Sequence, residues 1–200
     1  MRKLIVSEFV TLDGVMQGPG SPDEDREGGF EQGGWQMPYF DHIQMQAVSE
    51  AIAATGAYLL GRKTYQIFAS FWPQQPAGDP FADTLNGLPK HVVSSTLAEP
   101  LEWQGSTLVR GDVPAAVVRL KEEPGKDISV LGSGELVQTL LRHDLVDELW
   151  LMVCPLVLGS GKRLFREGLP PGRLRLLGST PTSTGAVMLS YGRAEAASSG

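Results

Sequence analysis

The chain has 200 residues, a formal net charge of −6 at pH 7 and a single cysteine, Cys154. This length suits one domain with a buried core. The excess of carboxylates, with no stripe of basic residues, argues against a nucleic-acid-binding protein. A single cysteine excludes a disulfide within the chain and a cysteine-rich metal site, so we expect no metal. The early apolar run at residues 4–6 is too short for a signal peptide, and no later run approaches a membrane span, so we expect a cytoplasmic protein.

Strands and helices are predicted to alternate through the first half of the chain. Residues 3–10 are rich in β-branched and aromatic side chains, which favour a strand. Residues 13–34 are glycine-rich and acidic, and a loop of this length is usually functional or disordered. The predicted elements that follow are a helix at 39–54, a strand at 57–60, a helix at 61–70, one helical turn at 81–85, and strands at 91–94 and 107–109.

The second half of the chain begins with a helix that Asp112 is predicted to cap and that runs to residue 121. The apolar run at 128–131 predicts a strand buried on both faces, which stops at Gly132-Ser133-Gly134. A helix follows whose apolar face is formed by Leu136, Val137, Leu140 and Leu141. Further strands are predicted at 148–158, 173–177 and 187–193, and residues 194–200 are expected to be frayed.

The order of these elements predicts the fold class. Strands that alternate with helices pair in parallel through crossover connections, whereas the last three strands have no helices between them and should be antiparallel. We therefore expect an α/β fold with a mixed, mostly parallel sheet of about eight strands and helices on both faces. Residues 1–193 are expected to form one domain.

Three strand ends carry groups that suit a phosphate. The glycines of Gly132-Ser133-Gly134 let an anion approach the main chain at a helix N-terminus, although such glycines also simply tighten turns. Ser133 is expected to cap this helix or to contact the phosphate. The cations of Arg62 and Lys63 precede another helix, and the alternative for them is a solvated surface pair. Ser95 and Thr96 add hydroxyls at a third strand end, and ligands of open α/β sheets bind beyond such ends.

The order of these junctions resembles the dihydrofolate reductase-like fold, in which three such strand ends hold NADPH. The matching segments are residues 61–65, 94–96 and 132–135. The run from Asp147 to Phe165 resembles the reductase (C-terminal) domain of the bifunctional riboflavin-biosynthesis deaminase-reductases and of their free-standing relatives, as do residues 7–14 and 34–39. The resemblance extends roughly from Met1 to Gly192.

The resemblance implies an NADPH-dependent reductase. It would pass a hydride to a carbonyl or imine of a phosphoribosyl-pyrimidine or a similar heterocycle, most like 5-amino-6-(5-phosphoribosylamino)uracil reductase of riboflavin biosynthesis. Arg62, Lys63 and Arg110 would favour NADPH over NADH by binding its 2′-phosphate. Relatives often pair, so a homodimer is expected. The implied cofactor site comprises Gly61, Arg62, Lys63, Thr64, Ser94, Ser95, Thr96, Arg110, Gly132, Ser133, Gly134, Glu135 and Leu136.

On the substrate side the resemblance makes Asp13 the first candidate for a polar contact, although Asp-Gly is also a common turn dipeptide. Trp35 and Trp72 border the two long loops, where aromatic residues either line a cleft or anchor the loop. Lys162 follows a tight turn and would face a substrate phosphate. The implied substrate-binding residues are Asp13, Trp35, Phe40, Trp72 and Lys162, and the implied catalytic residues are Asp13 and Asp41.

One departure from the family's pattern affects the substrate. Folate reductases carry a carboxylate two residues after the proline of Trp-x-x-Pro, but Phe40 occupies that position after Pro38. Asp41 comes one residue later, about 100° further around a helix. This departure argues against folate, and it leaves the proton donor unassigned. The zinc deaminase signature of the bifunctional enzymes is also absent, so another polypeptide would have to deaminate. The alternatives are an NADPH-binding protein without turnover, or a folate reductase that uses Asp41.

Overall fold

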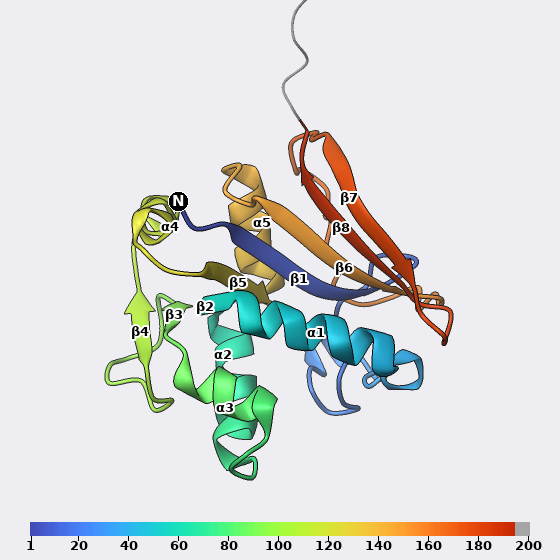
Figure 1. Cartoon of the computed structure of the whole chain (residues 1–200), viewed down its shortest axis with the longest axis horizontal. Coiled ribbons are helices and arrows are strands. Elements are labelled where there is room, and N and C mark those ends of the chain that lie inside the picture. The colour runs from blue at the N-terminus through green and yellow to red at the C-terminus, as the bar shows by residue number, and fades with distance from the viewer. Residues whose placement is uncertain (195–200) are drawn as a thin grey trace, which may run out of the picture.

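One eight-stranded sheet runs through the computed structural model, which describes residues 1–194 (Figure 1). The strands lie in the order β4-β3-β2-β5-β1-β6-β8-β7. They are β1 (Leu4–Thr11), β2 (Thr55–Gly61), β3 (Lys90–Val93), β4 (Ser106–Val109), β5 (Asp127–Leu131), β6 (Glu148–Cys154), β7 (Leu174–Pro181) and β8 (Val187–Arg193).

The pairing of these strands is parallel from β4 to β6 and antiparallel beyond. Each neighbouring pair from β4 through β3, β2, β5 and β1 to β6 is parallel. β8 runs antiparallel to both β6 and β7, and β7 and β8 form a long hairpin at one side of the sheet (Figure 1). The predicted mixed sheet with an antiparallel C-terminal end is confirmed.

Helices connect the parallel strands and cover both faces of the sheet. They are α1 (His42–Ala54), α2 (Arg62–Phe71), α3 (Pro80–Gly87), α4 (Val113–Glu122) and α5 (Gly134–Arg142). Three 3-10 turns, Glu27–Gly29, Met37–Tyr39 and Trp72–Gln74, lie in the loops.

Alternation along β2 shows how the two sides of the core are divided. Leu59 joins a buried cluster with the inward residues of α4 and α5, whereas Tyr58 and Leu60 point the other way. They pack with Tyr65 of α2 and Leu85 of α3. Each face of the central strands is therefore covered by helices, which explains why β2 and β5 are apolar on both sides.

The carboxyl ends of the parallel strands meet along one edge of the sheet, which we call the rim. β3, β2 and β5 are consecutive in the sheet and run in the same direction. The junctions that begin at Ser94, Gly61 and Gly132 therefore lie next to one another, as the predicted phosphate site requires.

Several boundaries differ from the prediction. β6 ends at Cys154 rather than at residue 158, because Pro155 has no amide to donate and the Leu156 amide turns back to the Cys154 carbonyl at 2.8 Å. The single turn expected at 81–85 is a full helix, α3, which Asp79 caps. α1 starts at residue 42 rather than 39, and β7 extends from 174 to 181. Of the tail expected to fray, residues 195–200 lie outside the described residues.

Candidate functional site

The junctions after β2 and β5 are joined by the side chain of Ser133. Its hydroxyl accepts a hydrogen bond from the Gly61 amide at 2.9 Å and donates one to the Leu131 carbonyl at 3.0 Å. The Ser133 amide donates to Thr64 Oγ1 at 2.9 Å. Ser133 adopts a left-handed conformation, with a φ of 62°. Ser133 occupies the N-cap position of α5, but its side chain forms no capping hydrogen bond, because its hydroxyl is used across the rim. A contact of Ser133 with phosphate stays a prediction.

The backbone at this junction leaves little room for side chains. A Cβ on Gly132 would lie 3.2 Å from Thr64 Oγ1, and Gly132 also has a positive φ of 56°. A Cβ on Gly134 would lie 3.1 Å from the sulfur of Met16 and 3.5 Å from Arg166 Nη2. The unpaired first amides of α5 and the positive end of its dipole are suited to an anion. Met16, from the loop after β1, covers them.

The β3 end lies on the other side of Gly61 along the rim. Ser94 is buried, and its hydroxyl accepts from the amides of Thr96 and Leu97 at 3.1 and 3.0 Å. It therefore shapes the turn, while Ser95 and Thr96 are exposed. The Arg110 guanidinium, just after β4, donates to the Leu97 carbonyl. These groups extend the polar rim towards the β4 edge of the sheet.

The cations near the rim are held by the acidic loop at residues 23–29. Lys63 pairs with Glu27, and Lys162 pairs with both Asp25 and Glu27. Hydrogen bonds from Lys162 and then Lys63 lower the pKa of Glu27 to about 2. Arg62, at the start of α2, is exposed and has no ion-pair partner among the described residues. The acidic loop thus pairs with two of the four cations that were predicted to bind phosphate, Lys63 and Lys162.

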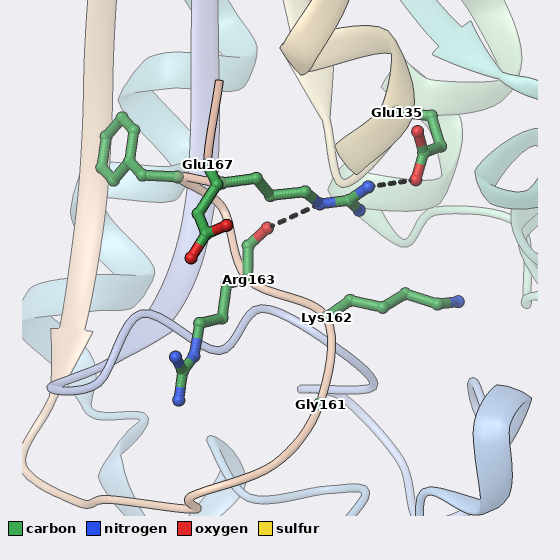
Figure 2. A pocket seen from close by; sticks show the side chains of 7 residues that line it. Glu135, Gly161, Lys162, Arg163 and Glu167 are labelled. Carbon is green, nitrogen blue, oxygen red and sulfur yellow. Dashed lines mark hydrogen bonds and ion pairs between the residues drawn. The ribbon is translucent and has the colours of Figure 1, made fainter. Parts of the chain in front are cut away.

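Two open cavities lie beside this loop. One, of about 380 Å³, is lined by residues of the segment after β6 and by Glu135 of α5. Figure 2 shows the Lys162 and Arg163 side chains leaving this segment in different directions. Arg166 pairs with Glu135 across this cavity. The second cavity, of about 330 Å³, lies under the acidic loop between Gln17 and Lys162.

Asp13 is engaged in a turn. Its carboxylate accepts from Thr11 Oγ1 at 2.6 Å and from the amides of Leu158 and Gly159 at 3.2 and 2.9 Å. The hydrogen bond from Thr11 and those from the two amides lower the pKa of Asp13 to about 2. This geometry accounts for Asp13 as a turn residue that joins the end of β1 to the segment after β6.

Asp41 likewise has structural partners. It caps α1 by accepting from the Gln44 amide at 3.0 Å, and its other oxygen accepts from the amide and hydroxyl of Ser183. The Ser183 hydroxyl is the largest cause that lowers the pKa of Asp41 to about 2. The carboxylate therefore ties α1 to the β7–β8 turn.

The aromatic candidates for substrate binding also pack within the protein. Trp35 is buried, and its indole N–H donates to the Gln17 carbonyl at 2.7 Å, so it anchors the long loop. Trp72 packs edge-on against Phe68 and Phe71 at the end of α2. Phe40 is partly buried between the 3-10 turn at Met37–Tyr39 and α1.

Sequence reasoning missed one residue at the rim, Glu8 of β1. It is 6% exposed, and one of its carboxyl oxygens has no hydrogen-bond partner among the described residues. Burial raises the pKa of Glu8 well above its usual value, and the nearby Gly132 amide opposes this only in part. The available signal was alternation, because Glu8 shares its face of β1 with the core residues Val6 and Val10.

The described residues contain neither a metal-binding cluster nor a membrane-spanning helix. No group of three His, Cys, Asp or Glu side chains in residues 1–194 is placed to hold a metal ion. Within the same residues, no helix has the length and apolar character needed to cross a bilayer.

The sheet order and the rim at the parallel strand ends define a dihydrofolate reductase-like α/β protein. Dihydrofolate reductase from Enterococcus faecalis, in a complex with NADP(H) and RAB-propyl, matches with a TM-score of 0.60 at 13% identity, covering 96% of this chain and 97% of that one. A putative riboflavin biosynthesis protein from Shewanella sp. PV-4 matches with a TM-score of 0.67 at 22% identity, covering 96% and 99%.

The chain belongs to the RibD C-terminal domain family, whose model matches residues 2–188. It is 31% identical over 196 residues to the uncharacterized protein YwjB of Bacillus subtilis, covering 96% of this chain and 99% of that protein. Both the fold and the family implied by the sequence resemblance are therefore confirmed.

Proposed function

We propose that this protein is an NADPH-dependent reductase that transfers a hydride to a carbonyl or imine of a small heterocycle. The nearest known reaction is that of 5-amino-6-(5-phosphoribosylamino)uracil reductase. The observation that carries the proposal is the Ser133 hydroxyl bound to the Gly61 amide, which fixes two helix N-termini side by side on one rim. Membership of the RibD C-terminal domain family supports the same class of reaction.

The rim offers a different group to each part of an extended dinucleotide. The amide of Gly134 and those of the following residues in the first turn of α5 would hold the diphosphate, since the Ser133 amide already donates to Thr64 Oγ1. Arg62, Ser95 and Thr96 would hold the adenosine end with its 2′-phosphate, with Arg110 beyond them towards β4. The nicotinamide would then lie towards β1, and when bound it would supply the hydride. The protein's contribution is to hold the two reactants in contact and to exclude water.

The substrate would occupy the cavities beside the segment after β6. Lys162 and Arg163 line the larger one, and their charges suit a phosphate on the substrate. Because Lys162 is already paired with Asp25 and Glu27, a substrate phosphate would have to compete with the acidic loop. Trp72 and Phe40 remain candidates for the substrate side.

Binding of NADPH is the direct test. We expect saturable binding at micromolar concentration, followed by the cofactor's fluorescence, and weaker binding of NADH because it lacks the 2′-phosphate. Arg62→Ala should weaken NADPH more than NADH, whereas Arg173→Ala, on the distant segment before β7, should affect neither. Absence of saturable NADPH binding by the wild-type protein would overturn the proposal.

A second candidate function is an NADPH-binding protein without turnover. It is favoured by the partners of Asp13 and Asp41, since both carboxylates proposed for catalysis are engaged in structural hydrogen bonds. Tight binding with no NADPH oxidation across a panel of pyrimidines, pterins and quinones would support it. The folate reductase that uses Asp41 would instead bind methotrexate and lose this binding in Asp41→Asn.

The homodimer and the cytoplasmic location stay predictions. β7 is an edge strand, and it exposes Leu174, Leu176 and Leu177, which are 48%, 52% and 42% exposed. We propose that two copies pair at this edge. Light scattering should give twice the chain mass for the wild type and a monomer for Leu176→Lys, and a wild-type monomer would contradict the pairing.

A further inference from the structure

Glu8 lies beside the proposed diphosphate site. β1 is the strand between β5 and β6, and Ser7 of β1 is level with Leu131 of β5. The next residues along these parallel strands are Glu8 and Gly132, so they are neighbours at the rim. Glu8 points to the same side of the sheet as Val6 and Val10, which pack with Leu136 and Val137 of α5. Its carboxyl group is therefore directed to the face covered by the N-terminal half of α5.

The carboxyl group of Glu8 is buried without full hydrogen bonding. It is 6% exposed, and its Oε1 has no partner among residues 1–194. A buried polar atom without a partner typically costs about 1–3 kcal/mol, so such atoms in native proteins usually meet a ligand or water. Burial favours the uncharged acid, which carries an O–H that can donate a hydrogen bond.

The charged groups on the elements around Glu8 leave its carboxyl group without an ion pair in the described part of the chain. They are Asp127 on β5, Glu148 on β6, Arg119, Lys121 and Glu122 on α4, Glu135 and Arg142 on α5, and Lys162, Arg163, Arg166 and Glu167 on the segment after β6. Glu135 pairs with Arg166, and Lys162 pairs with the acidic loop. Glu148 pairs with Lys3 at the opposite end of β1. None of these groups forms an ion pair with Glu8.

Access to this end of α5 depends on a flexible side chain. Met16 is 8% exposed, and its sulfur lies over Gly134. Methionine has three rotatable bonds and no branching, so it can move aside with little loss of packing. A ligand that reaches the first turn of α5 would displace Met16 from Gly134.

We propose that Glu8 is a binding residue of the dinucleotide site, whose buried and unpartnered carboxyl group forms a hydrogen bond to NADPH at the N-terminus of α5. This inference rests on the proposed function. An ionised Glu8 would lack the donor and would repel the diphosphate through a medium of low dielectric constant. Cofactor binding should therefore require the protonated form of this residue.

The test is the dissociation constant of NADPH measured by fluorescence from about pH 7 to about pH 9.5, where the phosphates stay ionised and Lys162, whose pKa is raised, in spite of burial, by its carboxylate partners, stays charged. Wild-type affinity should fall where the pH rises through the raised pKa of Glu8, by at most about tenfold per pH unit. Glu8→Gln keeps an N–H donor and cannot ionise, so it should bind like the wild type at the low end and show no loss at the high end. Glu8→Leu should bind about tenfold more weakly than the wild type at the low end, because the donor is gone, and its affinity should show no further loss as the pH rises.

The control variant is Glu148→Gln, which removes a carboxylate from the other end of the neighbouring strand and should keep the wild-type pH profile. Circular dichroism and thermal melts establish that each variant is folded. Equal affinity of Glu8→Leu and wild type at the low end of the pH range, or the same pH-dependent loss in wild type and Glu8→Gln, would overturn the role of Glu8 and leave the proposed function intact. A wild-type protein that binds no NADPH at any pH removes both.

Discussion

Ser133→Ala should lower the free energy of unfolding, because the Ser133 hydroxyl forms two hydrogen bonds at the rim. The substitution leaves the half-buried Gly61 amide without its acceptor at 2.9 Å and removes the donor to the Leu131 carbonyl. Because an unpaired buried amide costs about 1–3 kcal/mol, we expect the free energy of unfolding to fall by that amount. For a chain of this length, each 1 kcal/mol lowers the melting temperature by about 2–4 °C.

Ser133→Gly separates the hydrogen bonds from the backbone conformation. It loses the same bonds, but glycine adopts the φ of 62° without strain and should recover about 1 kcal/mol relative to alanine. Urea denaturation of the three proteins, with equal m-values, measures both differences. The reasoning is refuted if Ser133→Ala is as stable as the wild type, or if the glycine variant is the less stable of the two.

Three further outcomes are expected. Glu8→Gln should gain stability relative to the wild type as pH rises, because folding raises the pKa of Glu8. Such a carboxyl group stabilises the folded protein fully below its unfolded pKa and loses that contribution as pH rises through its folded pKa. Urea midpoints measured across pH test this, and parallel curves for the two proteins would contradict it. Asp41→Asn should remove the stability that the wild type loses as pH falls from 3.8 towards about 2, since the pKa of Asp41 is lowered; an unchanged acid profile in thermal melts would refute this role. Glu27→Gln should release Lys63, leave Lys162 paired with Asp25 alone, and tighten NADPH binding about two- to fivefold at low salt, with the gain lost at high salt. Glu31→Gln should have no effect.

The acidic loop and the two aspartates, Asp13 and Asp41, form structural contacts that reduce the number of charged groups available to a substrate. Asp13 and Asp41 hold together segments that are far apart in the sequence, and the Glu27 carboxylate occupies the cations that a phosphate would use. The polar groups left for chemistry are those of the rim itself, with Glu8 among them. A reductase built on this rim would rely on positioning more than on an exposed carboxylate.

Local patterns in the sequence were sufficient to predict the order of the elements and the position of the rim. The apolar run of β5, the glycines after it and the apolar stripe of α5 each describe a few neighbouring residues, and hydrophobic periodicity is strong there. Alternation of strands with helices then implies parallel pairing, and parallel strands necessarily place their carboxyl ends at one edge. The end of β6 was misplaced because periodicity extends through Pro155, although the backbone pairing does not.

The roles of individual polar side chains were decided only by the tertiary structure. Asp13 bonds to Gly159, Asp41 to Ser183 and Ser133 to Gly61, and no local pattern specifies a partner so many residues away. The sequence shows that Glu8 interrupts an apolar strand, but whether a carboxyl group is paired depends on what surrounds it in three dimensions. Hydrogen bonding is directional and acts over a few ångströms, so its partners exist only once the sheet has brought distant strands together.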